Sequence, residues 1–183
     1  MLNKIIALLI LLLILPIIIL ISILIYFEDD MPIFFFQKRV GINYSYFNIY
    51  KFRSMKKNTP NVATHLLTNP EKYLLKIGIF IRKTSLDELP NLINIIKGEM
   101  VFVGPRPALY NQDDLMALRV ATGVHKLKPG ITGWAQINGR DEISIEEKVA
   151  LEKEYLERKS FIFDLYIIFK TFTNVIFSKG VTH

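Results

Sequence analysis

The sequence of 183 residues contains no cysteine, one tryptophan and only three histidines. The lack of cysteine excludes disulfides, thiol nucleophiles and Cys-ligated metals, and it is compatible with the cytoplasmic side of a membrane. His65, His125 and His183 are too scattered to form a metal-binding spacing. The sequence also lacks internal repeats, a Gly-rich phosphate loop, a dinucleotide-binding fingerprint and a Ser-His-Asp pattern. The common nucleotide-binding motifs and the serine-hydrolase triad therefore do not describe this chain.

Acidic residues are outnumbered, with 17 Asp and Glu against 23 Lys and Arg, which gives a net charge of +6 at pH 7. Such a balance suits nucleic acid, an anionic membrane surface or phosphorylated substrates. The hydrophobic fraction of 51% is high for a soluble protein, and most of the excess lies in the first 27 residues. This distribution favours membrane lipids and phosphorylated substrates, so we expect no nucleic acid partner.

Residues 5–27 are almost wholly apolar, interrupted only by Pro16 and Ser22. About 20 such residues are enough to cross a bilayer core. A cleaved signal peptide would have a shorter apolar stretch followed by small residues, whereas Tyr26, Phe27 and three acidic residues end this one. We therefore predict a membrane helix over residues 1–30 and one compact domain over residues 31–183.

The membrane helix either crosses the bilayer or enters and leaves on the same side. Pro16 lies near its middle, where it removes a backbone hydrogen bond and bends a helix. Lys4 marks one end of the helix as cytoplasmic, and Lys38 and Arg39 mark the other end in the same way. We therefore favour a re-entrant helix over a straight span, which would place one basic end outside the cell.

The remaining pattern predicts a small α/β core of mixed (α+β) type. Ile33–Phe36 and Tyr46–Phe52 are expected to be strands joined by a turn at residues 41–43, and Met100–Val103 a third short strand. Helices are expected from Asn69 to about Arg82, from near Ser85 to Gly98, over Gln112–Thr122, from Ser144 to Arg158 and over Phe161–Phe177. Residues 126–138 are expected to be a loop, because they contain Pro129, Gly130 and Gly133. The last helix is either part of the core or an amphipathic helix at the membrane interface.

Asp87 and Glu88 form the most informative motif, two adjacent carboxylates beside Arg82 and Lys83. Acids at a helix start are often structural, and Ser85 with Glu88 matches a capping box. Pro90 argues for a helix that starts nearer Asp87, because proline is tolerated only in a first turn. Both carboxylates would then point at whatever the helix end faces. An anionic ligand is accommodated there if Mg²⁺ bridges it to the carboxylates.

Basic residues that suit phosphate occur in three other segments. Pro105 and Pro107 fix the backbone on both sides of Arg106, which favours a rigidly held guanidinium for bidentate phosphate contact. Lys51 and Arg53 alternate on one face of a strand and suit a diphosphate, although a solvated strand edge would look the same. Asn138 and Arg140 belong to a Gly-rich loop with the single tryptophan, which suits a uridine or a sugar.

Together these segments resemble the bacterial sugar transferases, small monotopic phosphoglycosyl transferases. The stretches that carry the resemblance follow in register along nearly the whole chain: Pro32–Arg39, Tyr50–Met55, Arg82–Pro90, Lys97–Met100, Val103–Pro107, Pro129–Gln136 and Asn138–Arg140. Residues 61–64, 107–112 and 180–183 resemble the capsule-type sugar transferases of Gram-positive bacteria more closely. The chain departs from the family at its start, where only Lys4 remains of a basic segment and Leu15-Pro16 replaces Ser-Pro.

The resemblance implies a cytoplasmic-face enzyme of the inner membrane that uses Mg²⁺ and a covalent phosphosugar intermediate on aspartate. Asp87 is then the nucleophile and Glu88 its partner at the metal, while Lys51 and Arg106 occupy substrate-binding positions. We assign Arg53, Arg82, Pro105, Pro107, Asn138 and Arg140 to substrate binding as well. The expected substrates are a UDP-sugar and undecaprenyl phosphate, and the product starts a capsule or O-antigen. The closer likeness to the capsule-type enzymes indicates an N-acetylated deoxyamino sugar.

Two other functions are compatible with the same residues. Asp87 and Glu88 would also suit a metal-dependent hydrolase of lipid diphosphates, in which they activate water. A membrane-bound scaffold with a basic lipid-binding face needs no pocket at all, so dispersal of Lys51, Arg82, Asp87, Glu88 and Arg106 would support it and clustering would reject it. A homodimer is compatible with the sequence, which does not specify the oligomeric state.

Overall fold

The computed structural model of the protein describes residues 1–60, 69–139 and 143–176. Its α-helices are α1 (Leu2–Leu13), α2 (Leu15–Asp29), α3 (Lys76–Lys83), α4 (Leu92–Lys97), α5 (Asp113–Ala121), α6 (Trp134–Ile137), α7 (Ile145–Arg158) and α8 (Phe161–Ile176). Its strands are β1 (Phe34–Val40), β2 (Tyr46–Phe52), β3 (Val101–Val103) and β4 (Gly130–Thr132). Short 3₁₀ helices lie at Ile42–Tyr44 (η1), Pro70–Tyr73 (η3), Leu86–Asn91 (η4) and Val124–Lys126 (η5). The predicted mixture of helices and small sheets is confirmed.

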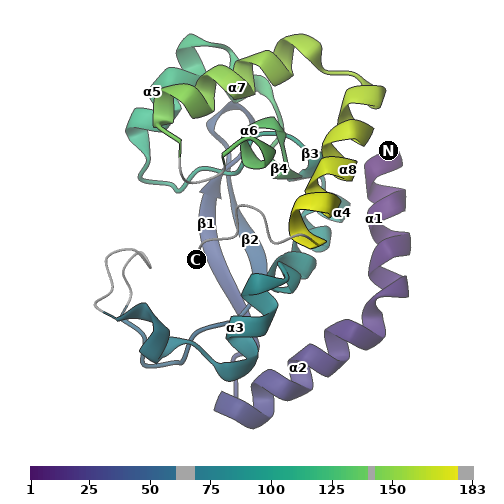
Figure 1. Cartoon of the computed structure of the whole chain (residues 1–183), viewed down its shortest axis with the longest axis vertical. Helices are drawn as coiled ribbons and strands as arrows, with labels where there is room; N and C mark the ends of the chain where they lie inside the picture. The colour runs from purple at the N-terminus through teal and green to yellow at the C-terminus, as the bar shows by residue number, and fades with distance from the viewer. Residues whose placement is uncertain (61–68, 140–142, 177–183) are drawn as a thin grey trace.

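The β1–β2 hairpin lies at the centre of the molecule (Figure 1). The strands pair antiparallel with Phe34 opposite Phe52 and Val40 opposite Tyr46. The turn contains Asn43 and Tyr44 at positive φ, 50° and 62°, within η1. Both predicted strands and the turn are confirmed, and β1 extends further than expected, to Val40.

The second sheet contains a strand where we predicted a loop. β3 and β4 pair in parallel, with Val101 opposite Gly130 and Val103 opposite Thr132. A Cβ atom on Gly130 would come within 2.2 Å of the backbone nitrogen of Gly104, so only glycine permits this approach. Gly130 is therefore needed for close packing of the strands. In a sequence, a glycine with this role looks the same as a glycine in a loop, which is why we predicted a loop here.

The helices predicted from Asn69 to Arg82 and from Ser85 to Gly98 are each divided in two. The first is interrupted at Leu74, which is extended (ψ 140°) and forms a β-bridge with Met55. The second starts as η4 and becomes α-helical only at Leu92, and Gly98 ends it at a positive φ of 87°. The capping box between Ser144 and Glu147 at the start of α7 is present, as predicted.

The two N-terminal helices are bent by 60° at the junction before Pro16, which sits at the start of α2. Among the described residues, no single helix is long and apolar enough to cross a membrane. By length and composition, α1 and α2 together would be, but as a bent pair. One face of the pair packs on the protein, where α1 contacts α4 and Ala7 shares a buried cluster with Ile49. Ile21 and Ile25 of α2 share a second buried cluster with Phe52. The other face leaves large apolar side chains exposed: Leu9, Leu12, Leu13, Ile19, Leu20 and Phe27 among them.

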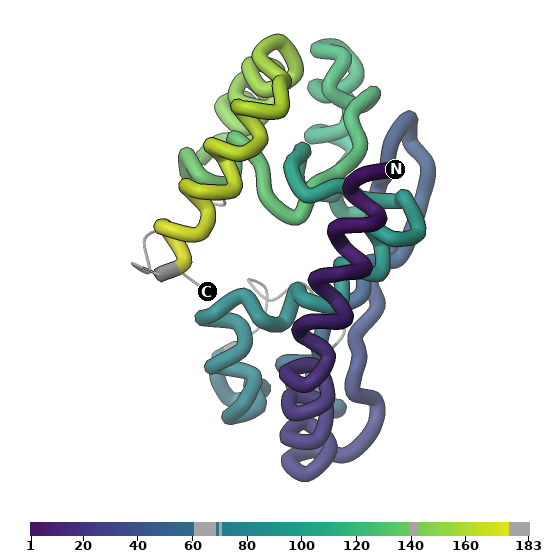
Figure 2. Tube along the Cα trace, turned by 90° about the vertical axis from the view of Figure 1, so that its right-hand side faces the viewer, coloured from purple at the N-terminus to yellow at the C-terminus, as the bar shows by residue number. Residues whose placement is uncertain are grey.

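Helices surround the central hairpin at both ends. In Figure 1, α2 and α3 lie toward one end and α5 and α7 toward the other, while α8 leads back from the α7 end. Figure 2 shows α1 and α8 on different sides of the molecule. α8 buries Phe163 and Ile167 against Val103 and Tyr155, and exposes Phe161, Ile162 and Phe169. This helix is therefore amphipathic, with one face in the core.

Candidate active site

The two carboxylates lie on η4, directly after a residue in the left-handed conformation. Ser85 has a φ of +57° and its side chain makes no capping bond, so the capping box with Glu88 is absent. Pro90 is buried inside η4, and the segment stays a tight 3₁₀ turn until the α-helix begins. Residues i and i+3 of a 3₁₀ helix lie one above the other, so Glu88 and Asn91 share a face.

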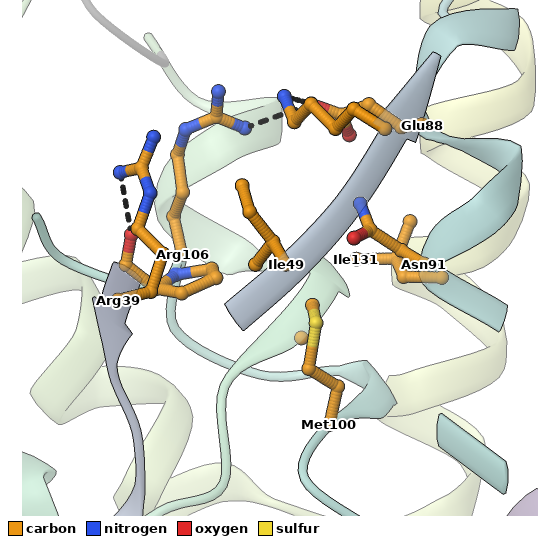
Figure 3. Close-up of a pocket in the computed structure, with 10 residues that line it drawn as sticks. Arg39, Ile49, Glu88, Asn91, Met100, Arg106 and Ile131 are labelled. Atoms are coloured by element: carbon orange, nitrogen blue, oxygen red, sulfur yellow. Dashed lines mark hydrogen bonds and ion pairs between the residues drawn. The ribbon is translucent and has the colours of Figure 1, made fainter. Parts of the chain in front are cut away.

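Glu88 is held by two cations from distant parts of the chain. Lys51 Nζ on β2 lies 2.6 Å from Glu88 Oε1, and Arg106 Nη1 lies 3.6 Å from the same oxygen. The side chains of Lys51 and Glu88 are only 17% and 14% exposed, so this contact is stronger than a surface ion pair. Figure 3 shows Arg106 reaching toward Glu88 across the mouth of a pocket.

The pocket combines a charged mouth with an apolar interior. It is lined by Arg39, Ile49, Lys51, Glu88, Asn91, Met100, Arg106, Pro107, Gly130 and Ile131. The two strand systems meet here, since Ile49 and Lys51 come from β2 while Gly130 and Ile131 come from β4. The arrangement suits a ligand with a phosphorylated end and a less charged end.

Asp87 is partly buried next to this group of charges. Loss of hydration raises the pKa of its carboxyl to about 6, although the positive charges of Lys51 and Arg82 oppose the shift and the charge of Glu88 adds to it. A carboxylate with a raised pKa and specific charged neighbours is typical of functional sites. Asp87 still ionises near neutral pH, as a nucleophile must.

The backbone around Arg106 is fixed by hydrogen bonds as well as by its prolines. Arg119 Nη2 donates to the Arg106 carbonyl oxygen at 2.9 Å, and Gly130 N–H donates to that of Pro105 at 2.9 Å. Arg39 Nη1 donates to the carbonyl oxygen of Pro107 at 3.1 Å. Pro105 and Pro107 therefore belong to a fixed backbone at Arg106, and Pro107 also lines the pocket. Arg39 is a pocket residue that the sequence analysis missed.

Arg53 does not join Lys51 at the pocket, contrary to the interpretation that both bind one diphosphate. β2 ends at Phe52, and Arg53 is 7% exposed, with its guanidinium bound to the end of α2. It donates to the Asp29 carboxylate, to the carbonyl oxygen of Pro32 at 2.6 Å and to that of Asp30 at 2.6 Å. Its hydrogen bonds fasten the N-terminal helix pair to the hairpin.

The other predicted binding residues have different positions. Arg82, in the last turn of α3, contributes positive charge at Asp87. Asn138 is exposed and donates to the carbonyl oxygen of Trp134 at 2.8 Å. Arg140 lies outside the described residues. Trp134 packs against Phe163, with ring centroids 5.1 Å apart, and donates to Glu154, so its ring belongs to the core rather than to an open platform.

Clustering of these charges contradicts the scaffold hypothesis. Lys51, Glu88 and Arg106 line one pocket, and the charges of Lys51 and Arg82 act on the carboxyl of Asp87 and oppose the rise in its pKa that burial causes. Adjacent carboxylates are the kind of group with which Mg²⁺ is held in proteins, through one or two carboxylates plus substrate phosphates. Within the described residues no set of three or more acidic or histidine side chains could hold a metal by itself.

Comparison with known proteins agrees with this geometry. The chain is 44% identical to the protein named "Uncharacterized sugar transferase EpsL" of Bacillus subtilis, over 82% of this chain and 73% of that one. It is 40% identical to the UDP-glucose:undecaprenyl-phosphate glucose-1-phosphate transferase of Escherichia coli, over 76% of this chain and 32% of that one. It is 37% identical to the galactosyl transferase CpsE of Streptococcus agalactiae, over 84% of this chain and 36% of that one.

The chain thus spans about three quarters of EpsL but only about a third of the two longer relatives. The sequence profile of one family, described as "Bacterial sugar transferase", matches residues 1–178. That match includes the N-terminal helix pair, the hairpin and every residue of the pocket. The chain belongs to the bacterial sugar transferase family.

Proposed function

We propose that this chain transfers a sugar-1-phosphate from a UDP-sugar to undecaprenyl phosphate and releases UMP. The observation that carries the proposal is the Asp87-Glu88 pair on η4, with Glu88 bound by Lys51 and Arg106. The names of the relatives support the same substrates, because several are called undecaprenyl-phosphate glucose transferases. A UDP-sugar brings a diphosphate, which matches the cations at the mouth of the pocket.

In the proposed reaction the Asp87 carboxylate attacks the β-phosphorus of the UDP-sugar. A bond forms between the carboxylate oxygen and phosphorus while the bond from phosphorus to the bridging oxygen breaks, and UMP leaves with that oxygen. A phosphate oxygen of undecaprenyl phosphate then attacks the phosphosugar and frees the carboxylate. Lys51 and Arg106 stabilise the negative charge that moves between the oxygens in each step, which is the main requirement of phosphoryl transfer.

We further propose that Asp87 and Glu88 hold Mg²⁺ together with the substrate diphosphate. The donor set fits, since hard carboxylate oxygens are the ligands that Mg²⁺ prefers, and a diphosphate would supply further oxygens. The bound ion would neutralise part of the diphosphate charge. The chain's own contribution is to hold Glu88 by Lys51 and to keep Asp87 in a partly dry environment.

The exposed apolar face of α1 and α2 is proposed to lie in the bacterial inner membrane as a re-entrant helix. The 60° bend and the single packed face support this topology, because a straight span would require lipid contact around most of its length. The catalytic domain would then lie on the cytoplasmic face, where UDP-sugars are made. The exposed face of α8 is a second apolar surface for the membrane interface.

The transferred sugar is proposed to be an N-acetylated deoxyamino hexose that starts a capsule or O-antigen, from the closer likeness to capsule-type enzymes. The relatives name glucose and galactose in their own reactions, so those sugars are the natural comparisons. A screen of UMP release across UDP-sugars, with polyprenol phosphate and Mg²⁺, identifies the donor.

The mechanism is tested with the Asp87→Asn variant in the same assay. We expect the variant to fold, to enter membranes and to release no UMP, since asparagine is nearly isosteric but is no nucleophile. Mass spectrometry of the parent enzyme, incubated with UDP-sugar and Mg²⁺ but without polyprenol phosphate, should detect one phosphosugar on the peptide that contains Asp87. Activity above a few per cent in the variant contradicts the aspartyl intermediate, and steady-state UMP release without polyprenol phosphate favours a hydrolase.

A further inference from the structure

Asn91 is a buried polar side chain whose carbonyl oxygen has no partner in the described parts of the chain. The residue is 3% exposed and its Oδ1 accepts no hydrogen bond there. It ends η4 and lines the pocket, three residues after Glu88 and on the same face. A buried acceptor without a donor costs about 1–3 kcal/mol, so its presence at this position needs an explanation.

The surroundings of Asn91 indicate which kind of chemical group would donate a hydrogen bond to its Oδ1. In Figure 3 its side chain lies apart from the charged groups of Glu88 and Arg106. Ile49, Met100 and Ile131 supply apolar walls, and Glu88 with Lys51 and Arg106 occupies the mouth. A phosphate is a poor partner for Oδ1, because its oxygens accept hydrogen bonds and would face another acceptor. A hydroxyl or amide N–H of a weakly charged group is a good one.

We propose that the side-chain amide of Asn91 binds the transferred sugar, with Oδ1 accepting a hydrogen bond from a sugar hydroxyl or N–H group. This inference rests on the proposed function and identifies a residue that distinguishes one UDP-sugar from another. With the diphosphate at Lys51 and Arg106, the sugar on the β-phosphate is the part of the substrate close enough to reach one 3₁₀ turn along η4. A sugar that lacks the matching donor group leaves Oδ1 buried and unpaired, which is how a polar site rejects an analogue.

Asn94 provides a matched control on the same helical segment. It is fully buried, at 0% exposed, and all its polar atoms are used within the protein. Its Oδ1 accepts from the backbone N–H of Tyr50 at 3.2 Å, and its Nδ2 donates to Asn48 O and Glu99 Oε2, each at 2.7 Å. Asn94 is therefore a structural asparagine, whereas the Asn91 acceptor has no partner in residues 1–60, 69–139 and 143–176.

The first measurement separates binding from folding. Asn91→Leu removes an acceptor that has no partner among the described residues, so its melting temperature should equal or exceed that of the parent. Asn94→Leu removes three hydrogen bonds and should lower the melting temperature by roughly 5 °C or more. If Asn91→Leu destabilises the protein as strongly as Asn94→Leu, Asn91 is structural and the inference is wrong.

The second measurement is calorimetric binding of UDP, UDP-glucose and UDP-N-acetylglucosamine in lipid nanodiscs. The protein with Asn91 and the Asn91→Leu variant both also carry Asp87→Asn, so that no UDP-sugar is consumed during the measurement. We expect Asn91→Leu to weaken the better UDP-sugar roughly 5- to 30-fold and UDP itself by less than twofold. Equal weakening of UDP and UDP-sugar, no weakening, or a parent that binds UDP as tightly as either sugar nucleotide would each overturn the inference.

Binding with and without Mg²⁺ distinguishes a sugar contact from a metal ligand. The effect of Asn91→Leu should persist in EDTA, and an effect seen only with Mg²⁺ would assign Asn91 to the metal instead. The outcome is also separable from that of the proposed function. Asn91-dependent sugar binding without polyprenol-dependent UMP release would retain this inference and reject the transfer reaction.

Discussion

Glu28, near the end of α2, caps the first turn of α3 through the backbone of Lys76. Its carboxylate accepts hydrogen bonds from the N–H groups of Lys76 at 2.5 Å and Ile77 at 3.1 Å. Leu75, at the N-cap position of α3, has no side chain that could do this. The N-terminal helix pair therefore completes the helix that leads to Arg82 and the Asp87-Glu88 pair.

We expect Glu28→Ala to lower the free energy of unfolding by about 1–2 kcal/mol, because it leaves two N–H groups of α3 uncapped and removes a charge from the helix N-terminus. Thermal unfolding monitored by circular dichroism measures the loss. Glu71→Ala, at an exposed acid in η3, is the control and should stay within about 0.5 kcal/mol of the parent. Equal stability of Glu28→Ala and the parent would show that this cap contributes nothing.

Asp87→Asn should change the pH dependence of stability. Burial favours the protonated carboxyl and raises its pKa from 3.8 to about 6, so the folded state is stabilised below pH 4 and loses that stability as the pH rises through 6. The variant removes the penalty and should be more stable than the parent at pH 8, by at most about 3 kcal/mol. The difference should disappear near pH 4. Melting temperatures in EDTA across this range test it.

Asp30→Asn is a control of opposite sign. The pKa of Asp30 is lowered by the backbone N–H of Met31 and by Lys57, so its carboxylate contributes stability above the usual pKa and loses it as the pH falls. The asparagine variant should be less stable than the parent at pH 8 and equal to it in acid. A parallel response of the two variants would mean that Asp87 is not in a dehydrated site.

Arg106→Lys should lower kcat/KM about 10- to 100-fold, since lysine cannot reproduce a planar contact with two oxygens and one charge-assisted contact is worth about 1.5–3 kcal/mol. UMP release at several concentrations of UDP-sugar gives the ratio. Arg158→Lys, at an exposed arginine on α7 paired with Glu154, is the matched control and should keep the parent rate. A rate within twofold for Arg106→Lys would remove this residue from the reaction.

Pro16→Ala should straighten the N-terminal helix pair, because it restores a backbone donor and removes the ring clash. The apolar stretch is then long enough to cross the bilayer, and part of the population should place Met1 outside. Asn3→Cys in this cysteine-free chain reports the topology through a membrane-impermeant thiol reagent on whole cells. The cysteine should be protected with Pro16 and partly labelled with alanine. Labelling with Pro16 present would establish a simple span.

Local sequence signals predicted local structure well. The Ser144–Glu147 capping box, the stop at Gly98 and the bend at Pro16 each depend on a few neighbouring residues, and the structure contains all three. Interruptions set by distant partners were not predicted. Leu74 leaves the helix because its backbone pairs with Met55, a contact that no window of sequence around Leu74 contains.

The site shows the same division. Adjacent Asp87 and Glu88 were evident as a motif, and the resemblance supplied Lys51 and Arg106 as their partners. Alternation along a strand wrongly joined Arg53 to Lys51, because the end of β2 and the acids after α2 redirect its side chain. Asn91 carried no signal at all in the sequence, since an asparagine in a helix start is ordinary and its unpaired oxygen becomes visible only from burial.

The packing of Ala7 on α4 has a geometric consequence for the lipid substrate. Ala7 is 0% exposed, and α4 continues directly from η4, so α1 is joined rigidly to the segment that carries the carboxylates. If α1 lies in the bilayer as proposed, the height of Asp87 above the lipid surface is fixed by protein contacts and not by the composition of the membrane. The phosphate of the polyprenol must then reach that level to react. Bilayer thickness would therefore affect the second step, transfer to the polyprenol phosphate. It would not affect the release of UMP in the first step.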